Sequence, residues 1–239
     1  MSRGLASVTM TLGLAACLVV AGGAQHRNRA GTPGLVLPRL SHHVLAPGAE
    51  VLDGSPYREV EIDATITEQG SVRTGVARGG SRDQRQQAVD AVRQWRFAPA
   101  TLNGGPVSVE GVVCVIAFGD RRLQPRLPPR PLTPDEQGLG RGAERAFAGS
   151  AIIPPAMRVR YNPPYTATLF RKLVRGEAEV LFVLLPDGTV GEARIVRALD
   201  AEADQLALAA AAGSVFAPAM KDGKPVAVLL NMAFTWGTR

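Results

Sequence analysis

The clearest pattern in the chain is the alternation of apolar and polar residues between positions 58 and 67. Side chains of a strand point to opposite faces in turn, so a half-buried strand alternates in this way. The apolar face consists of Val60, Ile62, Ala64 and Ile66. Residues 68–70 have the composition of a turn, and residues 72–78 can return as a second strand. The pattern therefore predicts an antiparallel hairpin.

A helix and a third strand are predicted after this hairpin. Ser81 is a suitable N-cap for a helix running from about residue 82 to residue 95. Its apolar stripe, spaced i, i+4 and i+7, is Ala88, Val92 and Trp95. Pro99 in the following segment prevents helical continuation and favours an extended backbone before it. Residues 107–118 are strongly apolar and predict the third strand.

The second half of the chain repeats this series. Strands are predicted over residues 178–185 and 190–197, a helix from Asp200 to about residue 214, and a last strand over residues 226–236. A further helix is predicted after Pro164. Its expected apolar stripe is Leu169, Phe170, Leu173 and Val174.

An internal repeat connects the two halves. The segment Phe-Ala-Pro-Ala occurs at 97–100 and again at 216–219, and each copy precedes an Asx-Gly turn. The turn glycines Gly70 and Gly188 keep nearly the same spacing. We interpret the following residues as the motif that specifies the fold: Trp95, Phe97, Pro99, Gly104, Phe216, Pro218 and Gly223. The predicted class is α+β, with two small repeats, each an antiparallel three-stranded sheet packed against one or two helices.

The composition between these segments suggests five parts. They are a leader at 1–24, a linker at 25–52, the first repeat at 53–119, a linker rich in Pro, Arg and Gly at 120–160, and the second domain at 161–239. The leader is apolar or small, with Arg3 as the positive charge ahead of it. Three fates stay open for it: cleavage after the small residues at 21–24, retention as a membrane anchor, or lipidation at Cys17.

Charge and chemistry narrow the class of function. The formal net charge is +6, which favours anionic surroundings such as a cell-wall polymer or a lipid surface. Aromatic residues make up only 5%, so we do not expect nucleic acid as a partner. All three histidines precede residue 44, which excludes a Ser/Cys–His pair within either repeat, and no phosphate-binding or nucleophile motif is present. We expect no enzyme activity, no cofactor and no metal site, because His42 and His43 have no third ligand nearby.

The second half resembles the C-terminal domain of TonB-type energy transducers over about 75 residues. The resemblance rests on Tyr161-Asn162-Pro163-Pro164 before a short helix, the Asp187-Gly188 turn, and the Phe-Ala-Pro-Ala segment followed by Asp222-Gly223-Lys224-Pro225-Val226. The first half is similar over about 60 residues, with its closest match at 88–100. The resemblance implies a location in the cell envelope of a Gram-negative bacterium, in the periplasm or anchored to a membrane.

Two functions follow from this resemblance. The first is an energy transducer or accessory for outer-membrane transport, whose partners are envelope proteins such as an outer-membrane receptor or an inner-membrane motor. The alternative is a periplasmic or lipid-anchored structural module on the cell wall without energy transduction. Two departures from the family favour the alternative: the leader contains no histidine, and the first spacer is only roughly 30 residues long.

The last predicted strand is the candidate binding element. A terminal strand is expected at a sheet edge, where its backbone can accept an extended peptide by strand addition. Its apolar face is formed by the even-numbered residues from 226 to 236. The other face carries the candidate partner-binding residues Leu229, Asn231, Ala233 and Thr235.

Overall fold

The computed structural model describes residues 28–123, 138–139, 142–144 and 150–237. The expected leader at 1–24, including Cys17, lies outside the described residues, as does much of the expected linker at 120–160. Among the described helices, none combines the length and the apolar character that a membrane crossing requires.

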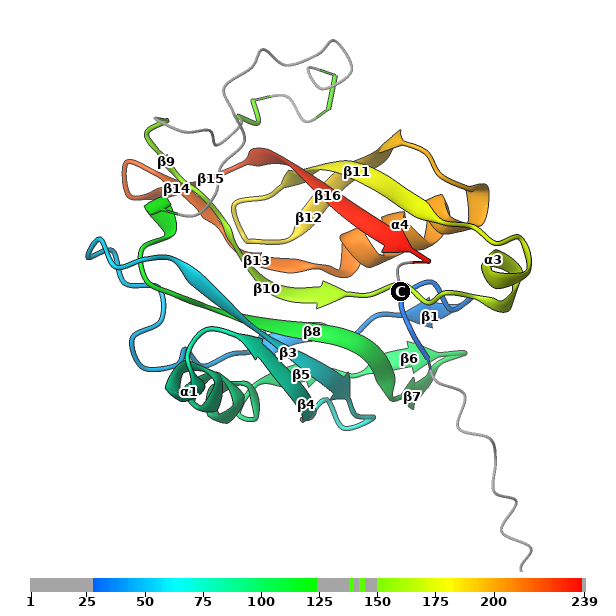
Figure 1. Ribbon diagram of the computed structural model, residues 1–239, viewed down its shortest axis with the longest axis horizontal. Helices are drawn as coiled ribbons and strands as arrows, with labels where there is room; N and C mark the ends of the chain where they lie inside the picture. Colours follow the sequence, from blue (N-terminus) through cyan, green and yellow to red (C-terminus); the bar gives the residue numbers. More distant parts are fainter. Residues whose placement is uncertain (1–27, 124–137, 140–141, 145–149, 238–239) are drawn as a thin grey trace, which may run out of the picture.

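The fold is a mixed α/β structure built on antiparallel sheets (Figure 1). The larger sheet has the strand order β13-β10-β8-β3-β4, and a second sheet has the order β12-β11-β16. The strands of the larger sheet are β13 (Val215–Ala217), β10 (Ala156–Tyr161), β8 (Val109–Phe118), β3 (Arg58–Ile66) and β4 (Val72–Gly79). Those of the second sheet are β12 (Val190–Arg197), β11 (Gly176–Leu184) and β16 (Val228–Trp236).

One helix accompanies each sheet. In the first half α1 (Arg82–Val92) contacts β3, β4 and β8. Ser81 caps it, and the side chain of Gln84 accepts a hydrogen bond from the Ser81 N–H to complete a capping box. In the second half α4 (Ala201–Gly213) contacts β10, β11 and β12, and Asp200 caps it. The chain order of strand, strand, helix and final strand is therefore the same around β3 and around β11.

In each half, the phenylalanine that follows the helix packs its backbone so closely against the turn that the turn position requires glycine. Gly70 and Gly188 have φ angles of +75° and +83°, in the left-handed region. A Cβ at Gly70 would lie 1.9 Å from the carbonyl oxygen of Phe97, and one at Gly188 would lie 2.0 Å from that of Phe216. Each phenylalanine N–H donates to the carbonyl of its glycine at 2.8 Å. The two turns thus use the same close backbone contact.

Short strands complete each half. In the first, β5 (Arg96–Ala98) pairs with β2 (Arg39–His42), and β6 (Ala100–Leu102) pairs with β1 (Leu35–Val36) and β7 (Gly105–Val107). In the second, β13 pairs with β10, and β14 (Ala219–Lys221) pairs with β9 (Ile152–Ile153) and β15 (Lys224–Val226). Strands from before each half thus pair with its Phe-Ala-Pro-Ala segment.

These pairings correct the expected linkers at 25–52 and 120–160. Residues 35–42 and 152–161 include paired strands rather than spacer. The strands are two to six residues long, too short to produce a recognisable period, and their partners lie far away in sequence.

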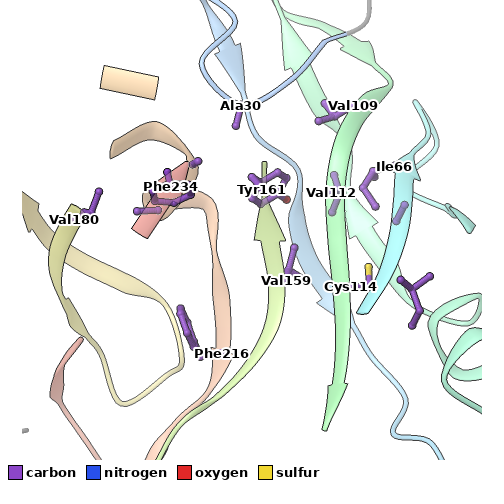
Figure 2. Close-up of a cluster of buried hydrophobic side chains, with 14 of the residues drawn as sticks. Ala30, Ile66, Val109, Val112, Cys114, Val159, Tyr161, Val180, Phe216 and Phe234 are labelled. Carbon is purple, nitrogen blue, oxygen red and sulfur yellow. The ribbon is translucent and has the colours of Figure 1, made fainter. Parts of the chain in front are cut away.

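β10 joins the cores of the two halves. It pairs with β8 of the first half on one side and with β13 of the second half on the other. Val159 and Tyr161 of β10 point into a hydrophobic cluster with Val112 and Cys114 on one side and Phe216 and Phe234 on the other (Figure 2). This cluster is continuous through both halves.

The helix expected after Pro164 is shorter than its pattern indicated. α3 (Ala167–Arg171) has five residues and buries Leu169. Phe170 and Leu173 are 63% and 66% exposed, so the four-residue apolar stripe predicted for it was wrong. Leu173 has a φ of +53°, which ends the helical backbone before a second turn can bury these side chains.

Trp95 is the largest completely buried side chain of the first half. Its indole N–H donates to the carbonyl oxygen of Val44 at 2.8 Å, and the ring of His43 packs against it edge-on. His43 itself stays exposed, and the loss of hydration where its ring packs lowers its pKa. The corresponding buried side chain of the second half is Ser214, whose hydroxyl donates to Ala210.

We expect Trp95→Ala to lower the free energy of unfolding by about 3–5 kcal/mol, because it removes a large buried ring and leaves a cavity. Urea denaturation followed by circular dichroism measures the loss. Ser214→Ala is the comparison in the other half and should cost only about 1 kcal/mol, for one hydrogen bond. A loss below 1 kcal/mol for Trp95→Ala would contradict the role of this side chain as an anchor.

Gly188→Ala should destabilise the protein much more than Gly223→Ala. Both glycines have positive φ, so both substitutions carry the left-handed cost of about 1–2 kcal/mol. Only at Gly188 does the new Cβ also collide with a backbone oxygen, because nothing lies within 4 Å at Gly223. Equal melting temperatures for the two variants would show that the contact with Phe216 is easily relieved.

Candidate partner-binding edge

The strand β16 lies at the edge of the second sheet. Its register with β11 is regular, from Gly176 opposite Trp236 to Leu184 opposite Val228. On the other side of β16, the described chain contributes one bridge, between Glu144 and Val228. The strand that was expected to be terminal in sequence is thus also terminal in its sheet.

The bridge to Glu144 reveals which backbone groups point away from β11. The N–H of Leu229 donates to the carbonyl oxygen of Glu144 at 2.8 Å, and the N–H of Glu144 donates to Ala227 at 3.3 Å. Alternate residues of an antiparallel strand direct both backbone groups to the same side. Ala233 and Thr235 therefore direct their N–H and C=O groups outward, away from β11, where no other described strand lies.

The four candidate side chains do not share one environment. Leu229 is buried in a small cluster with Leu139, Leu181 and Val183, so its side chain is not accessible from outside. Asn231 is half-buried, and its Nδ2 donates to Oε1 of Glu179. Ala233 and Thr235 are exposed. The accessible part of the candidate site is therefore the C-terminal half of β16.

The residues expected to specify the fold do not lie on this edge. Phe97 and Phe216 are buried behind their turn glycines. Gly104 and Gly223 have positive φ in the turns between β6 and β7 and between β14 and β15. Pro99 and Pro218 occupy the single-residue breaks between β5 and β6 and between β13 and β14. These residues shape the backbone, and none of them offers a reactive group.

The corresponding edge of the first half is already occupied by β10. Figure 1 shows β10 alongside β8. In the register of this pair, Val159, Arg160 and Tyr161 lie opposite Cys114, Val113 and Val112. The N–H of Asn162 donates to the carbonyl oxygen of Gly111 at 2.7 Å and extends this pairing by one residue. An extended segment of the same chain therefore covers the β8 edge by strand addition.

The shared partners of β8 and β16 define their equivalent positions. Cys114 lies opposite Ile62, and Met232 lies opposite Val180. Ile62 and Val180 are equivalent because each precedes its turn glycine by the same number of residues. It follows that Val115 and Ala233 are equivalent, since they lie opposite Glu61 and Glu179.

Ion pairs lie on the outer face of the larger sheet, and the alternation at 58–67 did not predict them. Arg160 pairs with Glu61 at 3.1 Å, and Arg78 pairs with Asp63 at 2.9 Å. Arg158 and Glu50 form a nearly buried ion pair. Arg158 and Arg160 flank the apolar Val159, and this alternation is the one signal in the sequence that could have identified β10 as a strand.

The remaining chemistry of the described residues is sparse. Burial raises the pKa of the Cys114 thiol to about 12, so this cysteine stays protonated and unreactive. In the described parts of the chain, no three His, Cys, Asp or Glu side chains come together as a metal site. Cys17, the candidate for lipidation, lies outside these parts.

Residues 161–237 thus form a small α+β unit in which β16 is an edge strand. This segment matches the family model described as Gram-negative bacterial TonB protein C-terminal. The match runs from the end of β10 through β16 and does not include the first half. Neither a curated protein nor a solved structure matches the chain.

Proposed function

We propose that this chain is a TonB-like envelope protein for outer-membrane transport that binds an extended segment of a partner protein along β16. The observation that carries the proposal is the outward-directed backbone of Ala233 and Thr235 within the segment that matches the TonB C-terminal family. The family match supports envelope proteins such as outer-membrane receptors as partners. Main-chain hydrogen bonds supply affinity in this mode of binding, and side chains supply selectivity.

The role in transport is that of an energy transducer or an accessory to one, located in the periplasm or anchored from the inner membrane. The alternative of a cell-wall module without transport is not favoured, because the match to the TonB family covers the whole unit that carries β16. The basic net charge of +6 is compatible with an anionic polymer or lipid as an additional contact.

We further propose that the chain carries two copies of one domain. The common chain order around β3 and β11 supports this, as do the matching contacts of Gly70 and Gly188. A third parallel is the single parallel bridge at the start of each final strand, from Asn28 to Val109 and from Glu144 to Val228. The first copy binds β10, and the second offers its edge to a partner.

A photo-crosslinking residue at position 233 or 235 should capture a partner protein in whole cells. Both positions are exposed on the outward side of β16. The same residue at position 196 is the control, because Val196 is 44% exposed on β12, at the opposite edge of the sheet. Equal capture from position 196, or no capture from either position of β16 in a strain that makes folded protein, would contradict binding at this edge.

With the crosslinking residue at position 235, Ala233→Pro should weaken partner capture at least tenfold, whereas Ala233→Ser should not. Proline removes the outward N–H and is tolerated at a sheet edge, so the fold survives while one main-chain hydrogen bond to the partner is lost. Capture yield normalised to folded protein measures the effect. Capture by the proline variant at the level of the serine variant would rule out a main-chain contact at this residue.

The mature N-terminus of the protein, determined by mass spectrometry, should show that the chain has been exported. Cleavage close to Gln25, an intact N-terminus in the inner membrane, or a lipid on Cys17 would each agree with an envelope location. An unmodified full-length chain recovered from the cytoplasm would contradict it.

A further inference from the structure

β10, the strand that covers the β8 edge, is held in place by an acidic side chain two strands away. Arg160 of β10 reaches across β8, and its two Nη atoms donate to Glu61 of β3 at 3.1 and 3.3 Å. Both side chains are about one-third exposed. Basic residues of β10 thus alternate with Val159 and Tyr161, whose side chains enter the core.

The second sheet contains the same arrangement of charges. In the larger sheet one row runs from Val115 through Glu61 to Arg78. In the second sheet the equivalent row runs from Ala233 through Glu179 to Arg197. Each row therefore has a small or apolar residue on the final strand, a glutamate in the middle and an arginine on the far strand.

The arginine at the far end of each row is engaged with a different carboxylate. Arg78 pairs with Asp63, and Arg197 pairs with Glu177 at 3.1 Å. In the first row this leaves Glu61 to bind Arg160. In the second row the contact of Glu179 is to the amide of Asn231, which occupies Oε1. A carboxylate has two oxygens and several lone pairs, so Glu179 retains capacity for a charged donor.

We infer that the strand that docks on β16 carries a basic side chain, and that Glu179 recognises it across Ala233. The inference rests on the proposed function and adds the chemistry of the partner. The partner segment is extended, with arginine or lysine alternating with apolar residues. Arg160 lies opposite Val113 and reaches diagonally to Glu61, which lies opposite Val115. The methyl group of Ala233 is smaller than the side chain of Val115, so it leaves the approach from the edge to Glu179 open.

An acidic segment is disfavoured at the same place. Glu177 and Glu179 lie on the outer face of β11, and a carboxylate docked beside Ala233 would face like charge without a described cation in reach on β16. A neutral segment would form the main-chain bonds alone. The order of affinity should therefore be basic, then neutral, then acidic.

The test uses the full-length protein and three fluorescent peptides. The first copies residues 155–162, which include β10; the second has both arginines replaced by glutamine, and the third has both replaced by glutamate. Fluorescence anisotropy gives the affinities, and a crosslinking residue at position 235 reports whether the peptide lies on β16. We expect the arginine peptide to bind about fivefold or more tightly than the glutamine peptide, as for a charge-assisted contact at a partly exposed site.

Substitutions of Glu179 assign the preference to this residue. Glu179→Gln should remove the advantage of the arginine peptide and leave the glutamine peptide unchanged, since the new amide oxygen can still accept from Asn231. Glu179→Arg should reverse the order in favour of the glutamate peptide. Glu192→Gln removes the same charge from an exposed position of β12 and should leave all three affinities unchanged.

The outcomes separate this inference from the proposed function. If the peptides crosslink at 235 with equal affinity, or with a preference that Glu179→Gln does not alter, the edge binds strands and the inference about Glu179 is wrong. If no peptide is captured at 235, strand addition at β16 itself is overturned, and this inference with it.

Discussion

The antiparallel pairing of β10 with β8 is the contact on which the arrangement of the whole molecule depends. It brings a strand from just before the second half onto the edge of the first, while β13 pairs on the other side of the same strand. Val159 and Tyr161 then contribute to both halves of a single hydrophobic cluster. The hydroxyl of Tyr161 donates to Pro38 at 2.9 Å, which ties the segment before the first half to the same strand.

The two halves differ in what pairs with the edge of their final strand. β10 covers the edge of β8, whereas the described chain contributes one bridge at the edge of β16. The β8 edge has Gly111 as an additional residue, which shifts its register against β3 and lies where Asn162 makes its backbone contact. β16 has no such shift and stays regular along its whole length. Outward-directed backbone groups on an edge strand are what strand addition uses.

Much of the fold could be predicted from periodicity, while its joining strand could not. The alternation at 58–67 predicted β3, because four apolar side chains face the core and every intervening side chain is at least partly exposed. β1, β2 and β9 are too short to alternate measurably, and Pro154 and Pro155 next to β10 resemble a spacer. Leu229 was assigned to the binding face because alternation does not indicate what covers a face, and here Leu139 covers it. Glu179, which we propose as a recognition residue, could not be predicted because a glutamate on a solvated strand face has no distinctive pattern. Its position becomes meaningful only beside its counterpart Glu61, in contact with Arg160.

The position of β10 in the chain has a consequence for the order in which the protein folds. A chain that emerges from a ribosome or an export channel presents its N-terminal part first, so β3, β4, α1 and β8 are available before residues 156–161. Until those residues follow, the β8 edge has no strand to pair with, and an open edge of a nascent chain is a site for aggregation. The time needed to synthesise the residues between β8 and β10 thus determines how long the β8 edge stays unpaired. A chaperone that binds the β8 edge would protect the chain from aggregation during that time.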